Sequence, residues 1–275
     1  MFDRLEIIGV EGLPEVKEGD DLTDLFFTAL AAKKESLEDG DAVVVTSKIV
    51  AKSEGRVVLL SSVKPTPEAV RIAEETEKDP RLVQLVLNDT KEVVRVRNNN
   101  LIVETRHGFV CANAGVDESN VEEGRAVLLP KDPQRSAERL KREIEARTGK
   151  EISVLISDSF GRAFRSGVTG VCVGVSGSGV PALLDRRGEE DRFGRIARIT
   201  KEAVADEVCA AANLVMGEFK ESVPIAIVRG LRFKCKRGEK EEEGKEEEGK
   251  EEEGKEEEGE GIKEVLFNRE DDLFR

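Results

Sequence analysis

The stretch with the most chemical potential follows a short apolar run in the second half of the chain. The run from Ile152 to Ile156 is rich in β-branched residues, which predicts a buried strand. Asp158 and Ser159 come next, followed by Gly161 and Arg162. Ligands bind at the carboxyl ends of strands in open α/β sheets. These side chains could hold a metal, a phosphate and a carboxylate; alternatively, Asp158 caps a turn beside solvated arginines.

A second polar cluster follows the predicted strand from Ala42 to Thr46. Ser47, Lys48 and Lys52 come directly after it, and lysine is a point charge suited to phosphate. The glycine pattern of a Walker A motif is missing around them. The cluster therefore indicates either a phosphate site or a surface edge with solvated lysines.

A third cluster follows the short predicted strand from Phe109 to Ala112. Asp117 could ligate a metal and Asn120 could bond a nucleotide, although both residue types also make turns. Asp117, Asp158 and Glu218 are carboxylates at or near the ends of predicted elements. Such an inventory suits two magnesium-type ions held by oxygen ligands. The pattern favours phosphoryl transfer, in which positioning and charge neutralisation do most of the catalysis.

Strands and helices alternate along the chain, which predicts a mixed α/β fold. The predicted strands are Leu5 to Val10, Ala42 to Thr46, Val93 to Val96, Leu101 to Glu104, Phe109 to Ala112, Ala126 to Leu129, Ile152 to Ile156, Val168 to Val175 and Val223 to Val228. The predicted helices are Leu22 to Lys34, Pro67 to Glu77, Pro80 to Asn88, Pro133 to Thr148 and Ile199 to Met216.

Composition and charge exclude several classes of protein. The 275 residues allow one large domain or two ordinary ones, and the net charge of -14 argues against nucleic-acid binding. The N-terminus lacks the features of a signal peptide, and the longest uncharged run, residues 167–184, is too rich in glycine for a spanning helix. We therefore expect a cytoplasmic protein with no membrane or nucleic-acid partner.

The cysteines and the single histidine argue against a structural zinc site. The four cysteines are widely spaced, and no pair has CxxC spacing. Cys111 and Cys172 lie in apolar runs, so we expect them in the core. His107 has no second candidate ligand nearby, and we expect a structural role for it.

Two charged segments stand apart from these clusters. Lys240 to Gly259 is four copies of Lys-Glu-Glu-Glu-Gly without an apolar residue. This composition predicts a disordered loop insertion, residues 234–261, in a domain formed by residues 1–233 and 262–275. An interaction arm is the alternative. The arginine-rich segment from Leu183 to Arg198 indicates either a surface network of ion pairs or a site for an anionic substrate.

In this order, the motifs resemble the coenzyme F(420)-0:L-glutamate ligases, also called coenzyme F(420):gamma-glutamyl ligases. The resemblance covers nearly the whole chain and departs from the family pattern at about residues 234–261. The segments that carry it are Val10 to Pro14, Ser47 to Arg56, Asn113 to Gly124, Ser157 to Gly170, Asp185 to Gly194 and Ala212 to Gly230.

The resemblance implies a mixed α/β fold of two intertwined subdomains and a homodimer. It implies an enzyme that uses GTP, Mg or Mn as divalent ions, and K as a monovalent cation. Such enzymes join L-glutamate to a carboxylate of coenzyme F(420)-0 and then add a second glutamate through a gamma linkage. The alternatives are a metal-dependent phosphohydrolase or kinase, and a non-catalytic nucleotide-binding module.

The resemblance also implies residue roles by position in the motifs. The GTP site would be lined by Leu13, Pro14, Glu15, Val16, Ser47, Lys48, Lys52 and Asn120, and the segment containing Gly217, Phe219, Lys220, Glu221 and Ser222 would close over it. The metal ligands would be Asp117, Asp158, Ser159 and Glu218. Beyond the resemblance, our mechanistic hypothesis is that Asp158 and Lys52 act in catalysis and that Arg162 or Arg165 grips a substrate carboxylate.

Overall fold

The computed structural model describes residues 4–233, 261–267 and 272. The predicted loop insertion with its charged repeats therefore lies outside the described residues, apart from Gly261. Within the described part of the chain, no helix is both long and apolar enough to cross a membrane.

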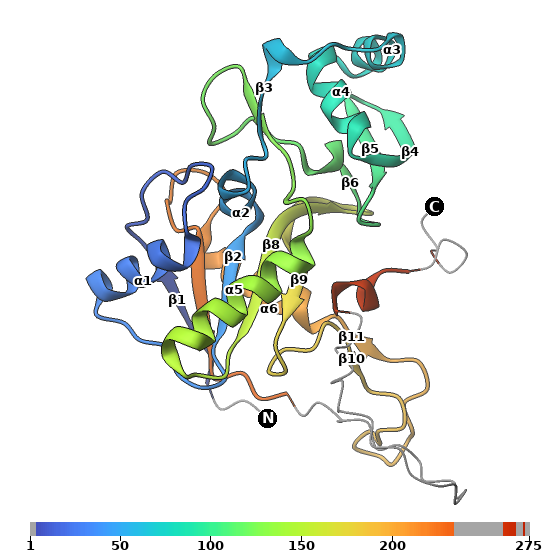
Figure 1. Cartoon of the computed structure of the whole chain (residues 1–275). Helices are drawn as coiled ribbons and strands as arrows, with labels where there is room; N and C mark the ends of the chain where they lie inside the picture. Colours follow the sequence, from blue (N-terminus) through green and yellow to red (C-terminus); the bar gives the residue numbers. More distant parts are fainter. Residues whose placement is uncertain (1–3, 234–260, 268–271, 273–275) are drawn as a thin grey trace, which may run out of the picture.

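A five-stranded mixed sheet forms the centre of the molecule (Figure 1). Its strands, in spatial order, are β1 (Glu6–Val10), β12 (Ile225–Arg229), β2 (Ala42–Thr46), β8 (Ser153–Arg162) and β9 (Arg165–Ser176). β2 and β8 run parallel, and the other neighbours are antiparallel. The apolar runs that form β2 and the first half of β8 are buried, as a strand covered on both faces requires.

Helices cover both faces of this sheet. α1 (Leu22–Lys33) and α5 (Pro133–Thr148) contact each other on one face, and α6 (Val204–Met216) packs on the other against β9, β1 and β12 (Figure 1). Asp21 caps α1 by accepting hydrogen bonds from the backbone of its first turn. Gly149, at a φ of 65°, ends α5. Both helix ends agree with the prediction.

A second hydrophobic cluster is formed by the part of the chain that runs from β3 (Val57–Leu59) to β7 (Arg125–Val127). These two strands pair with each other. Its members include buried side chains of the helices and of the three-stranded sheet that come between these two strands in the sequence. These elements are η1 (Leu60–Ser62), α3 (Pro67–Thr76), α4 (Pro80–Asn88), β4 (Thr90–Arg97), β5 (Asn100–Thr105), β6 (Val110–Ala112) and η2 (Asn113–Gly115). The mixed α/β fold is as predicted, and the described residues build it around two hydrophobic cores.

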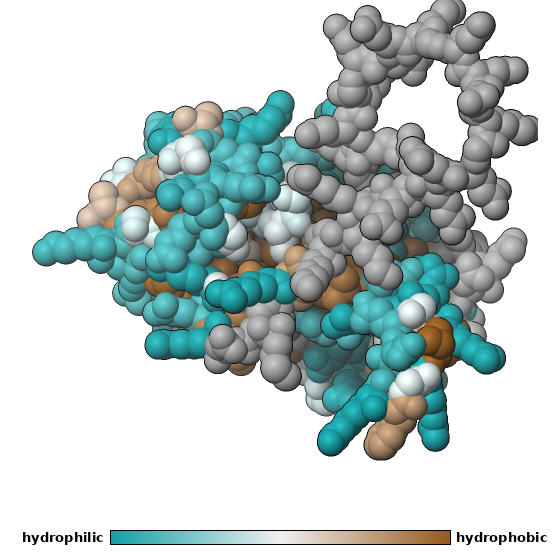
Figure 2. All heavy atoms as spheres, turned by 90° about the horizontal axis from the view of Figure 1, so that it is seen from below, coloured by the Kyte–Doolittle hydropathy of each residue, from teal (hydrophilic) through white to brown (hydrophobic). Residues whose placement is uncertain are grey.

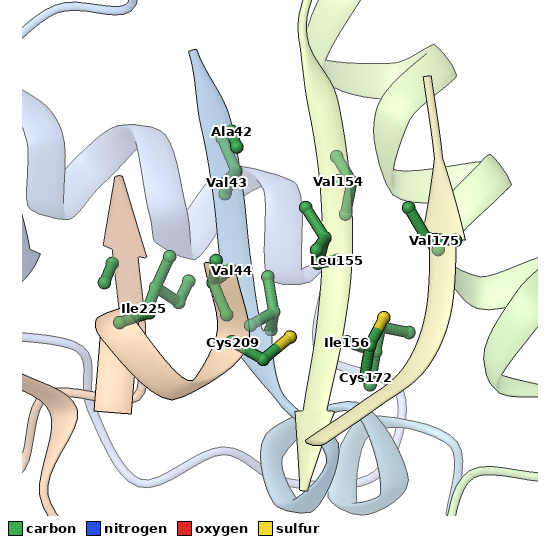
Figure 3. Packing of buried hydrophobic residues seen from close by; sticks show 14 of the residues in the cluster. Ala42, Val43, Val44, Val154, Leu155, Ile156, Cys172, Val175, Cys209 and Ile225 are labelled. Atoms are coloured by element: carbon green, nitrogen blue, oxygen red, sulfur yellow. The ribbon is translucent and has the colours of Figure 1, made fainter. Parts of the chain in front are cut away.

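The main core is aliphatic and contains buried thiols. Figure 3 shows Val44, Leu155 and Ile225 packed across neighbouring strands, together with Cys172 and Cys209. Cys111 is buried in the same cluster, so the predicted core positions of Cys111 and Cys172 are confirmed. Ile262, in the short helix η3 (Gly261–Val265), is 5% exposed and packs into this core after the charged tract.

The arginine-rich segment forms an arm around the short strands β10 (Leu184–Asp185) and β11 (Lys201–Glu202). Arg186 contacts Glu189 and Glu202, and Arg187 contacts Asp185, so these two arginines belong to surface ion pairs. The space-filling view shows hydrophilic residues over most of the visible described surface, with apolar residues scattered among them (Figure 2).

Two local predictions were wrong. β8 continues to Arg162 because β9 pairs with it along its whole length, so Asp158 and Ser159 lie inside the strand. The helix expected from Ile199 begins at Val204, since β11 occupies the preceding residues. The residues directly after β2, to which no secondary structure was assigned from the sequence, form a helix, α2 (Ser47–Ser53).

Candidate functional site

Parallel pairing of β2 and β8 brings the first two polar clusters together. Thr46 lies opposite Ser157 at the end of this pairing, so the next residue of each strand, Ser47 and Asp158, meet at the same edge. The Ser47 hydroxyl donates a hydrogen bond of 2.9 Å to Oδ1 of Asp158. A hydroxyl from α2 therefore orients a carboxylate on the central sheet.

Asp117 joins this edge through Lys48. Backbone hydrogen bonds of 2.9 and 2.8 Å with Val127 fix the position of Asp117 beside β7. The Lys48 ammonium donates to Oδ2 of Asp117 and to the Ser119 hydroxyl, both at 2.7 Å. The Ser119 backbone N–H donates to Oδ1 of Asp117 at 2.9 Å, a local turn that Asp residues favour. The third cluster thus reaches the first two.

Lys52 closes the same region from the next turn of α2. Its side chain is 8% exposed, and its ammonium contacts the carboxylate of Glu15 and donates to the carbonyl oxygen of Asn120 at 2.6 Å. The interpretation of these lysines as solvated is therefore wrong for Lys52. A cation with so little access to water, held between two loops, is suited to an anionic ligand that enters between them.

The two carboxylates of this edge differ in their pKa values. Burial raises the pKa of Asp158 to about 6, with a small further rise from the charge of Asp117, against the hydrogen bonds from Ser47 and Ser159. Burial also acts upward on the pKa of Asp117, but hydrogen bonds from Lys48 and Ser119 outweigh it and hold that pKa below its ordinary value. Paired groups whose pKa values are pushed apart are typical of catalytic sites.

The other two predicted metal ligands lie together as a separate pair. The Ser159 hydroxyl donates to Oε1 of Glu218 at 2.7 Å, and the Asn213 amide donates to the same oxygen at 2.8 Å. Adjacent side chains of a strand point to opposite faces, so Ser159 faces away from its neighbour Asp158. The structure therefore brings Ser159 to Glu218, and Asp158 to Ser47 and the Asp117 cluster.

A divalent cation fits the Asp117 and Asp158 pair in donor chemistry. Within the described residues, no group of three or more His, Cys, Asp or Glu side chains is arranged to hold a metal. Mg²⁺, however, is usually bound by one or two carboxylates together with water and substrate phosphates. Two neighbouring carboxylates beside two lysines match that pattern, and the phosphates of a bound substrate would supply the remaining oxygen ligands.

Arg162 and Arg165 follow Asp158 along the β8–β9 hairpin. They pair with each other at the tip of the β8–β9 hairpin, and both are exposed. The segment from Gly217 to Ser222 is also exposed and follows directly from α6, with Gly217 at a φ of 70°. Among the described residues, neither the two arginines nor this segment contacts Lys48 or Lys52. In the sequence, the arginines follow Ser159 closely and the segment contains Glu218.

The family profile described as F(420)-0:gamma-glutamyl ligase matches residues 12–230. The chain belongs to this family. It is 46% identical over 271 residues to the coenzyme F(420):L-glutamate ligase of Methanothermobacter thermautotrophicus. This alignment covers 98% of the present chain and 99% of the relative.

Two further relatives carry the same name. The protein of Methanocaldococcus jannaschii is 47% identical over 82% of this chain and 88% of its own length. The protein of Archaeoglobus fulgidus is 45% identical over 83% of this chain and 88% of its own length. The resemblance read from the motifs is thus confirmed, and the gamma-glutamyl ligase match spans every predicted site residue.

Sequence reasoning missed three residues at or near the candidate site. Ser119 holds both Lys48 and Asp117, and the spacing Asp-x-Ser of a local turn was the available signal. Asn213 fixes Glu218 from the last turn of α6. Cys111 lies near Asp158, and burial together with that negative charge raises the pKa of its thiol to about 12. Nothing local marks the last two, because long-range packing brings them there.

Proposed function

We propose that this protein is a GTP-dependent ligase that adds L-glutamate to coenzyme F(420)-0, first through an amide and then through a gamma linkage. Membership of the gamma-glutamyl ligase family supports glutamate ligation to this coenzyme. The nucleotide, the second addition and the intermediate are part of the proposal. The observation that carries it is the edge at which Lys48, Lys52, Asp117 and Asp158 converge.

The reaction follows from the chemistry of these groups. A carboxylate of the coenzyme attacks the γ-phosphorus of GTP, and GDP leaves, which forms an acyl phosphate. The amine of L-glutamate then attacks the acyl carbon, loses a proton and displaces inorganic phosphate. Each step moves negative charge over phosphate oxygens, and fixed cations stabilise such charge best in a site with little water.

Each side chain of the edge has a role in this scheme. Lys52 leaves its ion pair with Glu15 and binds phosphate oxygens from its buried position. Lys48 likewise leaves its ion pair with Asp117 to bind phosphate oxygens. Ser47 keeps Asp158 oriented. Asp117 and Asp158 would hold Mg²⁺ or Mn²⁺, which neutralises phosphate charge when bound. A K⁺ ion is a further component of the proposal.

The groups that border the edge complete the scheme. The exposed segment from Gly217 to Ser222 closes over GTP, and Leu13 to Val16 line its other side. Arg162 or Arg165 grips a substrate carboxylate through its planar guanidinium. The hairpin tip that carries both arginines is exposed, which leaves them accessible to a large anionic substrate.

We extend the proposal to a homodimer. Several large apolar side chains are exposed on the arm around β10 and β11: Phe193 is 84% exposed and Ile199 is 88% exposed. Exposed apolar side chains of this size on projecting segments favour contact with another protein surface. A second copy of the chain would cover them.

The decisive experiment is incubation with GTP, L-glutamate, Mg²⁺ and coenzyme F(420)-0, followed by mass analysis of the coenzyme and assay of GDP. We expect mono- and diglutamyl products that form in step with GDP. Phosphate release independent of glutamate would instead indicate a phosphohydrolase. Nucleotide binding without turnover would indicate a non-catalytic module. Replacing GTP by ATP in a parallel reaction tests the nucleotide.

The Asp158→Asn substitution tests the site itself. Asn keeps an oxygen that can accept the Ser47 hydrogen bond but removes the charge, so we expect a folded protein whose ligation falls by about 10³-fold or more. The matched control is Asp39→Asn, an exposed carboxylate elsewhere on the surface, which should retain activity. Full activity of the Asp158 variant would refute the assigned role.

A further inference from the structure

Two cysteines from different elements lie near each other inside the main core. Cys172 lies on β9 and is 1% exposed, and Cys209 lies on α6 and is 0% exposed (Figure 3). The Cys172 thiol donates a hydrogen bond of 3.2 Å to the carbonyl oxygen of Gly174, and the Cys209 thiol lies close enough to help raise the pKa of the Cys172 thiol. Both thiols are free in the structure.

The backbone holds α6 unusually close to β9 at this point. A Cβ built on Gly170 would lie 2.6 Å from the carbonyl oxygen of Cys209, so only glycine allows the helix this near the strand. Gly170 and Cys172 are two residues apart on β9 and share the face that α6 covers. The Cys172 backbone N–H donates at 2.9 Å to Asp206, one helical turn before Cys209. These contacts hold the backbones that carry the two thiols close together.

From this geometry we propose that Cys172 and Cys209 are a site of covalent modification, a disulfide that joins β9 to α6. The two thiols give up two hydrogen atoms and two electrons, and one S–S bond forms between them. The electron acceptor is a small-molecule disulfide such as oxidised glutathione, whose own S–S bond breaks to give two thiols. The exchange passes through one mixed disulfide.

The bond would join two elements that adjoin the Ser159–Glu218 pair. β9 is the partner strand of β8, which carries Ser159. α6 carries Asn213 and leads into Glu218. A cross-link one helical turn from Asn213 therefore limits separation of α6 from the sheet beside the site.

Burial determines when the bond forms. It raises the pKa of the Cys172 thiol well above its ordinary value, so the reactive thiolate is scarce in the folded chain. Oxidation of the folded protein is therefore slow, and the bond forms during folding, while the thiols are still accessible to glutathione. The product is then shielded from reductants by the same packing.

The test is refolding of the full-length protein from guanidinium in a mixture of reduced and oxidised glutathione, followed by peptide mapping without reductant. We expect a linked peptide pair containing Cys172 and Cys209, and a melting temperature about 5 to 10 °C above that of the reduced sample. The double variant C111A/C235A keeps only this pair and should show the same rise. The double variant C172A/C209A keeps the other two cysteines and should show none.

Three outcomes would overturn the proposal. Cys172 and Cys209 remain reduced at equilibrium, they link mainly to Cys111 or Cys235, or the linked protein melts below the reduced one. Because the map of the unmodified sequence decides the first two, the conclusion does not depend on whether a variant folds.

Discussion

The Lys48 ammonium lies 2.7 Å from Oδ2 of Asp117 and so occupies the position on this carboxylate that a divalent cation would take. With the Asp117 side chain 46% exposed, the ion pair is open to exchange with ions from solution. Lys48 is thus either a counterion of Asp117 or a phosphate ligand, and its state should change when metal and nucleotide bind.

Lys48→Met should therefore separate two kinds of binding. Loss of the ammonium frees Asp117 from a competing cation, so we expect Mn²⁺ to bind about five- to tenfold more tightly in the absence of nucleotide. GTP should bind at least about tenfold more weakly, because a phosphate ligand is lost. Both constants can be measured by calorimetry or by the magnetic resonance of Mn²⁺.

The control for this experiment is Lys64→Met, a substitution of an exposed lysine between η1 and α3. It changes the net charge equally and should alter neither constant. Unchanged or weaker Mn²⁺ binding in the Lys48 variant would show that Lys48 and the cation do not compete.

Asp158 should give the stability of the metal-free protein a particular pH dependence. Its folded pKa of about 6 lies above the ordinary value of 3.8, so ionisation of the carboxylate opposes folding. The protonated carboxyl of Asp158 therefore contributes stability that is fully present below about pH 4 and is lost as the pH rises through 6. At about 1.4 kcal/mol per pKa unit, this loss amounts to about 1 to 3 kcal/mol for a partly exposed group.

The substitution Asp158→Asn should remove this loss. The melting temperature of the variant relative to the unmodified protein should rise between pH 4 and pH 7 in the presence of a chelator. Thermal unfolding followed by circular dichroism at several pH values measures the difference. A difference that stays flat with pH would mean that Asp158 has an ordinary pKa.

Much of the fold followed from local sequence, for identifiable reasons. Pro67, Pro80 and Pro133 stand at the first helical positions of α3, α4 and α5, and the helices begin there. Asn98 and Asn99 adopt positive φ in the tight turn between β4 and β5, as the hairpin prediction requires. Such signals act within a few residues and can be read without the tertiary structure.

The site was only partly predictable, because its contacts join distant segments. The sequence marks Ser47, Asp117 and Asp158 as polar residues near strand ends, but the parallel pairing of β2 with β8 is what makes two of them neighbours. That Asp158 and Ser159 face different partners depends on the extension of β8, which the apolar run alone does not reveal. Strand length here is set by the partner β9.

A buried ion pair away from the site should contribute to stability. The guanidinium of Arg229 donates to both carboxylate oxygens of Asp41, at 2.9 and 2.8 Å, and the Asp41 side chain is 1% exposed. Asp41→Asn should lower the free energy of unfolding by about 2 to 4 kcal/mol, because Arg229 loses its main partner while partly buried. Denaturant titration measures the loss.

Glutamate ligation by the Asp41 variant should persist below its melting temperature, since this pair lies at the opposite end of β2 from Ser47. Asp39→Asn is the matched control: this carboxylate is exposed, and its loss should cost less. Equal destabilisation by the two substitutions would show that burial of the Asp41 ion pair does not determine the cost of removing its charge.

The close approach of α6 to β9 gives a last prediction, which compares two glycines of the same hairpin. Alanine at Gly170 would place its Cβ 2.6 Å from the carbonyl oxygen of Cys209, in the backbone of α6. Neither element can give way without disturbing the core, so we expect Gly170→Ala to destabilise the protein by about 1 to 3 kcal/mol or more. At Gly161 an added Cβ meets nothing within 4 Å.

Gly161→Ala should therefore leave the free energy of unfolding within about 0.5 kcal/mol of the unmodified protein. Denaturant unfolding of both variants, at fixed pH and in reductant, gives the comparison directly. Because both positions lie in the β8–β9 hairpin and receive the same methyl group, a difference between them isolates the helix contact. Equal effects at the two positions would show that α6 moves freely on the sheet, and the shared facing of Cys172 and Cys209 would then lose its support.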